Sequence, residues 1–89
     1  MKVKLELYGA SRDLSEKNFI EFDVKGKSSI KDLKKKIISY VDIHYKGNKN
    51  YKKIVEASAF CSEDNNIVSD NYVINKDQKI GIIPPIGGG

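Results

Sequence analysis

Two segments near the start of the chain alternate apolar and charged residues with the period of a half-buried β-strand. In residues 2–8 the apolar positions are Val3, Leu5 and Leu7. In residues 18–24 one face carries Ile20, Phe22 and Val24. We expect these two strands to pair as an antiparallel hairpin across a polar connection, residues 9–17.

An amphipathic helix follows the hairpin. Ser29 and Asp32 have the spacing of a capping box, which favours a helix that starts at Ser29. The apolar residues then recur with helical period on one stripe, formed by Ile30, Leu33, Ile37, Tyr40 and Val41. We predict that the helix ends within residues 42–45 and that residues 46–53 form a polar loop.

The second half of the chain contains shorter apolar segments separated by polar clusters. Residues 54–61 are a strand candidate, residues 67–68 a brief strand, and residues 72–74 a short segment that could be a 3₁₀ turn. Residues 79–83 form the last strand, and they are almost wholly apolar after Lys79. A strand that is apolar on both sides belongs in the centre of a sheet.

This order of elements predicts an α+β fold, a mixed sheet of four to five strands packed against one main helix. Placing the first and last strands side by side as a parallel pair gives the β-grasp, or ubiquitin-like, architecture. The predicted domain covers residues 1–83, and residues 84–89 form an extended tail that leaves from the middle of the sheet.

The tail has the composition of a thread that another protein could accommodate. Pro84 and Pro85 stop the strand because neither residue has a backbone N–H to donate. The six residues span about 20 Å when extended, and the last three are glycines without side chains. The reactive group at the tip is the carboxylate of Gly89, which becomes an acyl donor once a partner adenylates it. A frayed end or an engineered remnant is the alternative, but neither accounts for two prolines directly after a hydrophobic strand.

Composition narrows the function classes. The net charge of +4 comes from fifteen lysines and a single arginine, which indicates a solvated lysine surface rather than a nucleic-acid interface, where arginine is favoured. The single Cys61 excludes an internal disulfide and suits a reducing cytoplasm. No apolar run is long enough to span a membrane, and residues 1–5 lack a signal-peptide core. We therefore expect a cytoplasmic protein with neither nucleic acid nor membrane as partner.

The residues that usually carry catalysis form no recognisable constellation. We find no nucleophile–base–acid set, phosphate loop or metal-ligand cluster, so we expect no metal and no enzyme acting alone. Cys61 has no motif nearby to activate it, and His44 is expected to be a helix cap or a surface residue.

Both ends of the chain resemble one family. Residues 3–13 are similar to the first strand and turn of the molybdopterin-synthase small subunit (MoaD), and residues 80–88 to that family's last strand and its Pro-Pro…Gly-Gly tail. The thiamine sulfur carrier (ThiS) and the ubiquitin-related and small archaeal modifiers share this fold and tail. The acidic turn that often precedes the last strand in the family is replaced here by residues 76–79. This departure leaves the identity of the partner open.

The resemblance implies a protein sulfur carrier. An adenylating partner enzyme would use ATP to activate Gly89, sulfur would convert it to a thiocarboxylate, and the large synthase subunit would accept the tail and pass sulfur to a pterin precursor. The chain itself would bind no cofactor. Candidate site residues are Gly88 and Gly89 for activation and transfer, Pro84, Pro85, Ile86 and Gly87 for fit in a partner's channel, and Arg12, Tyr8 and Phe60 for docking.

Two other functions remain open from the sequence. The first is a ubiquitin-like modifier that is joined through its terminal glycine to lysines of target proteins, a reading favoured by the same tail, the many lysines and the altered turn. The second is an interaction domain without tail chemistry. In addition, Arg12 could fix the first turn, and Tyr8 and Phe60 could both belong to the core.

Overall fold

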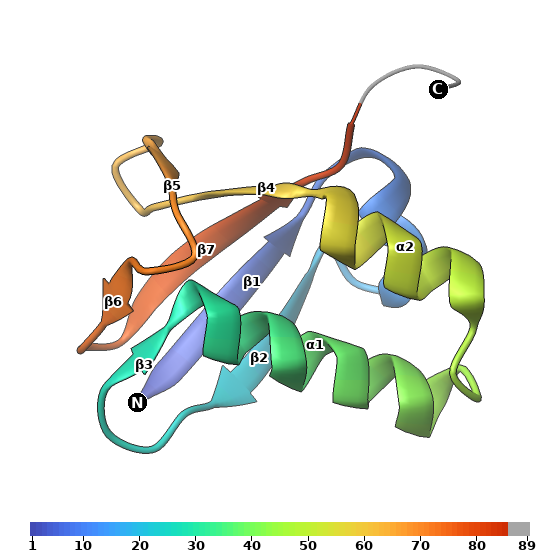
Figure 1. Ribbon diagram of the computed structural model, residues 1–89, viewed down its shortest axis with the longest axis horizontal. Coiled ribbons are helices and arrows are strands. Elements are labelled where there is room, and N and C mark those ends of the chain that lie inside the picture. The colour runs from blue at the N-terminus through green and yellow to red at the C-terminus, as the bar shows by residue number, and fades with distance from the viewer. Residues whose placement is uncertain (86–89) are drawn as a thin grey trace.

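The computed structural model describes residues 1–85, and in these residues it has two layers (Figure 1). One layer is a five-stranded mixed sheet in the order β2-β1-β7-β4-β5, and the other contains two helices that cover one face of the sheet. The strands are β1 (Lys2–Leu7), β2 (Phe19–Asp23), β4 (Ala59–Cys61), β5 (Ile67–Val68) and β7 (Gln78–Ile83), and the helices are α1 (Ile30–His44) and α2 (Lys49–Ala57). The predicted β-grasp architecture is confirmed.

The last strand lies in the centre of the sheet, as its apolar sequence indicates. β7 pairs in parallel with β1, with Leu5 opposite Ile80 and Leu7 opposite Ile82, and it pairs antiparallel with β4 on its other side. β1 in turn pairs antiparallel with β2, as the alternating pattern predicts. The two central strands therefore point in the same direction and end at the same edge of the sheet.

The main helix begins where the capping pattern places it. The Ser29 hydroxyl accepts a hydrogen bond from the Asp32 amide at 3.2 Å, and the Asp32 carboxylate accepts one from the Ser29 amide at 3.0 Å. This hydrogen bond from the Ser29 backbone lowers the pKa of Asp32 from its ordinary value. These two hydrogen bonds satisfy the backbone amides of Ser29 and Asp32 at the start of α1.

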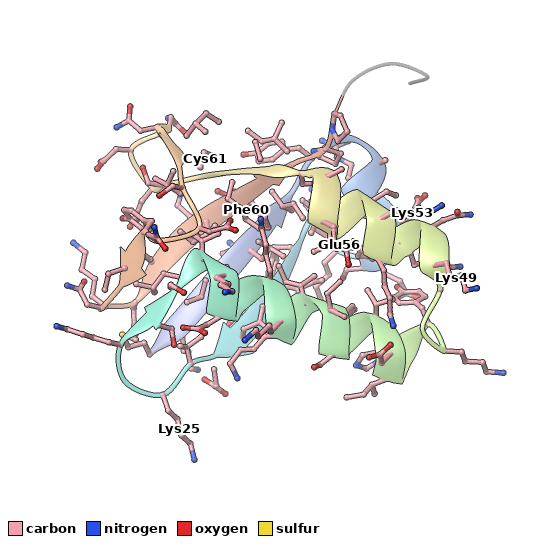
Figure 2. The ribbon with its side chains drawn as sticks, viewed as in Figure 1. Lys25, Lys49, Lys53, Glu56, Phe60 and Cys61 are labelled. Atoms are coloured by element: carbon pink, nitrogen blue, oxygen red, sulfur yellow. The ribbon has the colours of Figure 1, made fainter. Side chains whose placement is uncertain are left out.

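The prediction of a polar loop over residues 46–53 is wrong, because most of it belongs to α2. The Asn48 side chain caps this helix by accepting from the amides of Asn50 and Tyr51 at 2.9 and 3.1 Å. Tyr51, Ile54 and Val55 then stand at helical spacing, and Val55 is fully buried. The lysines that suggest a loop lie on the outer face, where Figure 2 shows Lys49 and Lys53 projecting outward.

The extent of α2 also shortens the strand predicted over residues 54–61, since only Ala59–Cys61 is extended. Two further segments differ from the expectation. The polar connection after β1 contains the 3₁₀ helix η1 (Gly9–Leu14), which buries Leu14. The segment predicted as a possible turn contains β6 (Val73–Ile74), which pairs antiparallel with β3 (Ser28–Ser29) beside the main sheet. An apolar run of two or three residues is too short to show whether the segment is a strand or a turn, and here the partner strand also has only two residues.

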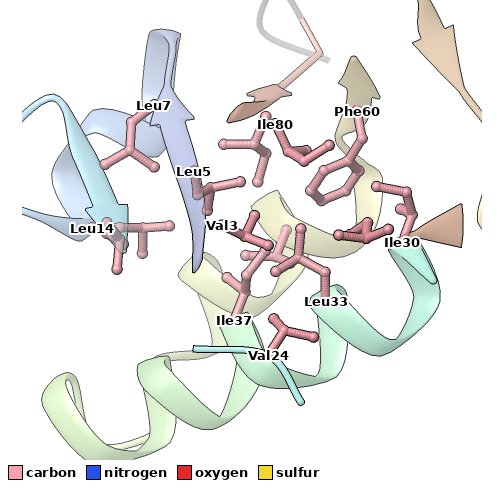
Figure 3. Packing of buried hydrophobic residues seen from close by; sticks show 14 of the residues in the cluster. Val3, Leu5, Leu7, Leu14, Val24, Ile30, Leu33, Ile37, Phe60 and Ile80 are labelled. Atoms are coloured by element: carbon pink, nitrogen blue, oxygen red, sulfur yellow. The ribbon is translucent and has the colours of Figure 1, made fainter. Parts of the chain in front are cut away.

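The core lies between the sheet and the helices (Figure 3). It consists of the inward side chains of the central strands, the stripe of α1, single residues from η1, α2, β2, β4 and β6, and Val24 after β2. Phe60, which is 2% exposed, is part of this core. No helix within residues 1–85 is both long and apolar enough to cross a membrane.

Candidate functional site at the carboxyl ends of the central strands

The chain leaves the sheet where β1 and β7 end together. Leu7 is paired with Ile82, so the following residues, Tyr8 and Gly9, lie beside Ile83 and Pro84. Pro84 is buried, and its Cδ lies 3.9 Å from the position that a Cβ on Gly9 would occupy. Packing thus continues through Pro84, one residue beyond Ile83, and the described chain leaves the body at Pro85. Pro85 is exposed. Ile86, Gly87, Gly88 and Gly89 lie outside the described residues.

Beside this exit, the face of the sheet opposite the helices holds a shallow apolar depression of about 290 Å³. Its lining comes from three strands, β4, β5 and β7, from the loop between β4 and β5, and from the residue that follows β1. The lining residues are Tyr8, Cys61, Asn65, Ile67 and Ile83. Tyr8 is 43% exposed and Ile67 is 66% exposed. The rest of this face, toward the amino end of β1, is charged, with Lys2 opposite Asp23 and Lys4 opposite Glu21. The apolar part of the open face is therefore concentrated where the tail begins.

Gly81 makes room for this depression. It lies in the middle of β7 on the open face, paired with Cys61 of β4. A Cβ at this position would lie 2.7 Å from Cys61 Sγ and 3.2 Å from Tyr8 Cε2, both inside normal contact distance. The absence of a side chain lets the Tyr8 ring and the Cys61 thiol approach the sheet.

We predict that Gly81→Ala lowers the free energy of unfolding by about 1–3 kcal/mol, because the added methyl group overpacks the site. Cys61→Ala in the same chain is expected to recover a large part of this loss by removing the nearest atom. Urea denaturation of both single variants and the double variant measures the coupling. Strict additivity of the two substitutions would contradict the contact.

The turn that orients Tyr8 is held by Ser11. This residue is fully buried, and its hydroxyl donates to the Tyr8 carbonyl at 2.6 Å and accepts from the Tyr8 amide at 3.0 Å. Arg12, the next residue, is exposed, and its side chain makes no hydrogen bond or ion pair with residues 1–85. Ser11 supplies the side-chain hydrogen bonds of this turn, and both roles of Arg12, in fixing the turn and in docking, stay predictions.

The two aromatic residues predicted to take part in docking differ in their exposure to solvent. Tyr8 is exposed in the depression, as the prediction requires, whereas Phe60 is buried between the sheet and α1. The prediction that Phe60 belongs to an exposed patch is wrong, because the alternation of the short strand β4 turns Phe60 inward and Cys61 outward. The sequence analysis did not identify Gly81, Ser11, Ile67 or Ile83 as part of the site. For Gly81 the sequence did contain a signal, an isolated glycine in an apolar strand.

The described residues offer no metal-binding cluster beside the depression. Residues 1–85 contain no cluster of three or more histidine, cysteine or acidic side chains placed to hold a metal ion. His44 lies at the last turn of α1, exposed, with its ring 4.4 Å from that of Tyr40. It is a surface residue, in line with the expectation from sequence. The geometry at the end of the central strands is that of a surface for binding, next to a tail.

The fold of the described residues is the ubiquitin-like, or β-grasp, fold. Among solved structures, the chain is similar to a protein assigned as subunit 1 of the molybdopterin converting factor in Pyrococcus furiosus. The TM-score is 0.69 at 18% identity, over 96% of this chain and 98% of that one. It is also similar to SAMP1 from Haloferax volcanii, with a TM-score of 0.71 at 11% identity over the full length of both chains. No family model matches the sequence, and no curated protein matches it.

Proposed function

We propose that this protein is a sulfur carrier in molybdopterin biosynthesis, with the carboxylate of Gly89 as its functional group. The observation that carries the proposal is the central, parallel position of β7, which brings the chain out at Pro85 beside an exposed apolar depression. The tail sequence and the likeness to the converting-factor subunit support the same function.

The proposed chemistry proceeds on partner proteins. A Gly89 carboxylate oxygen attacks the α-phosphate of ATP in the active site of an adenylating enzyme, and pyrophosphate leaves. The terminal sulfur of a persulfide donor then attacks the acyl adenylate and displaces AMP, which gives an acyl disulfide. A thiol cleaves the S–S bond of this disulfide, so that the thiocarboxylate is released and the donor sulfur leaves in a new disulfide with that thiol. The large subunit of the synthase accepts the tail and transfers the sulfur to the pterin precursor. The chain supplies the acyl group and the docking surface, so it acts as a carrier in the cytoplasm rather than as an enzyme.

We infer that the depression around Tyr8 is the surface on which these partners dock. An exposed apolar patch next to the reactive tail lets one contact area hold the body while the tail enters an active site. The two steps would use the same surface in turn, so the adenylating enzyme and the large subunit would compete for it.

Mass spectrometry of the intact protein tests the proposal directly. After incubation with the adenylating enzyme, ATP, a persulfide sulfur donor and a thiol reductant, we expect the exchange of one oxygen for one sulfur at Gly89. A control without ATP should give no exchange. If the complete reaction also leaves the mass unchanged, the sulfur-carrier function is excluded for that partner set.

The likeness to SAMP1 over the full length of both chains favours a second candidate, a small modifier joined to lysines. In this function the acyl adenylate is passed on to an amine and ends as an isopeptide bond. Trypsin cleaves this chain for the last time after Lys79, so digestion of proteins from a cell lysate would leave residues 80–89 on target lysines. The absence of this remnant in cells that express the protein would exclude the modifier function.

A further inference from the structure

The outer strand β2 has an open edge. β2 lies at one end of the sheet and pairs with β1 only, so its other side has no strand partner among the described residues. The opposite end of the sheet is formed by β5, which has only two residues. β2, with five residues, is therefore the longer free edge of the sheet in the described part of the chain.

The hydrogen bonds to β1 show which backbone groups of β2 face outward. Met1 and Val24 exchange hydrogen bonds in both directions, and the Leu7 amide donates to the Asn18 carbonyl. Since bonded pairs alternate along an antiparallel ladder, Ile20 and Phe22 are bonded to β1 in the same way. The N–H and C=O groups of the residues between them point away from the sheet, and these residues are Phe19, Glu21 and Asp23.

A second depression lies directly beside this edge, on the helix side of the sheet. It has a volume of about 310 Å³ and is formed by one residue of β2 and several of α1: Phe22, Lys36, Ser39, Tyr40, Ile43 and His44. Phe22 and Tyr40 meet edge to face, with ring centroids 6.1 Å apart. Ile43 is 76% exposed, more than any other large apolar side chain of residues 1–85. The fold does not need this isoleucine for its own core.

The charge of the depression is positive. Lys36 lines it, whereas the ion pairs of residues 1–85 involve other lysines, Lys34 with Asp70 and Lys52 with Asp42. Asp32, one turn before Lys36, accepts hydrogen bonds from Ser29. No acidic residue lines the depression. A carboxylate carried by an incoming partner would therefore complement Lys36.

On the open face of the sheet, the side chains that β2 itself contributes at this edge include two carboxylates. Glu21 and Asp23 project on the open face, where their cross-strand neighbours are Lys4 and Lys2. A second copy of this chain is a poor occupant of the edge, because antiparallel pairing of two β2 strands about Glu21 would bring two carboxylates together. The edge instead favours a strand with basic residues on one face and apolar and acidic residues on the other.

We propose that the β2 edge binds an extended segment of a partner protein, which adds a sixth strand to the main sheet. Its backbone bonds to the outward groups of Phe19, Glu21 and Asp23, its apolar side chains enter the depression beside Ile43, and an acidic residue on the same face pairs with Lys36. In the sheet, β1 separates this edge from β7, the strand that precedes the tail, and the Tyr8 depression lies on the other face. A partner bound here leaves the tail free for activation, so the proposal does not depend on the chemistry of Gly89.

A synthetic peptide of the sequence Thr-Val-Lys-Ile-Lys-Glu, blocked at both ends, is a suitable probe. When it is extended, its valine, isoleucine and glutamate lie on one face and its threonine and lysines on the other. A peptide of the same composition with the alternation scrambled is the control. At probe concentrations up to about 1 mM, backbone amide hydrogen exchange of the whole chain is followed by NMR.

We expect exchange to slow at the amides of Glu21 and Asp23 and to stay unchanged at Ile20 and Phe22, which are already bonded to β1. This alternation distinguishes strand addition from non-specific adhesion. Slowing that is equal at all four amides, slowing confined to the residues around Tyr8, or no effect of the probe at about 1 mM would overturn the proposal.

Two variants sharpen the result. Ile43→Asp is expected to weaken probe binding by about tenfold or more, whereas Ile67→Asp, at a similarly exposed residue of the other depression, should not change it. Lys36→Glu should weaken binding of the original probe and improve binding of a probe that ends in lysine instead of glutamate. Equal effects of the Ile43 and Ile67 substitutions, or no reversal with the charge-swapped probe, would count against the proposed site.

Discussion

Removal of Gly88 and Gly89 is expected to abolish formation of the thiocarboxylate and of any isopeptide bond, while the free energy of unfolding stays within about 0.5 kcal/mol of the parent chain. The reason for the first effect is reach: the truncated chain still ends in a glycine, Gly87, but its carboxylate falls two residues, about 7 Å of extended chain, short of the adenylating site. The reason for the second is that the buried core comes from β1, β7, the helices and the segments around them. Mass spectrometry after activation and urea denaturation measure the two quantities.

A chain with one alanine appended after Gly89 is the matched control for this truncation. It keeps every native residue but moves the carboxylate onto a residue with a side chain, so activation should fail again unless a protease first removes the addition. If the truncated protein is still charged with sulfur, or if its unfolding free energy falls by several kcal/mol, the tail does not have the proposed role.

Phe60→Ala is expected to lower the free energy of unfolding by about 3–5 kcal/mol, because it removes a large buried ring and leaves a cavity. The ring is 2% exposed and packs among the residues of the inner face, with Ile30 and Ile80 nearby in Figure 3. A domain of this size has a total stability of about 5–15 kcal/mol, so the loss is a large fraction of the whole. Urea denaturation at 25 °C measures it.

Tyr8→Ala is the matched control for this substitution, since it also replaces an aromatic ring in the same sheet. Because Tyr8 is exposed, we expect a loss of no more than about 1 kcal/mol in stability but a clear loss of affinity for the adenylating enzyme. The opposite pattern, a stable Phe60 variant and an unstable Tyr8 variant, would contradict the burial that the structure assigns to the two rings.

The pattern of apolar residues was sufficient to predict the central sheet and α1. Three local patterns were enough: the alternation in β1 and β2, the continuous apolar run of β7 and the capping pair at Ser29. Each pattern follows from a local physical requirement, so it can be recognised in the sequence alone. These elements also place the end of β7 next to the end of β1. The position at which the tail leaves the sheet was therefore predictable from residues far apart in the chain.

The helix α2 and the lining of the site were not predictable in the same way. The sequence of α2 is short and rich in lysine and asparagine, so its three inward residues at helical spacing do not stand out. The only sequence feature that indicates the start of the helix is the capping residue Asn48. The depression depends on which face of the three-residue strand β4 turns inward, a choice decided by packing against β7. The same uncertainty produced the wrong interpretation of Phe60, since alternation in three residues does not define which side is buried.

The attachment of the tail to β7 has a mechanical consequence. A pull on the tail along its axis acts on a strand held on both sides, by β1 and by β4, so the hydrogen bonds of both ladders bear the load together in shear. Forced unfolding under such a load is governed by the rate of crossing the unfolding barrier rather than by equilibrium stability. In the proposed function, a partner that pulls on the tail would therefore load both ladders at once, and the globular body would resist the pull.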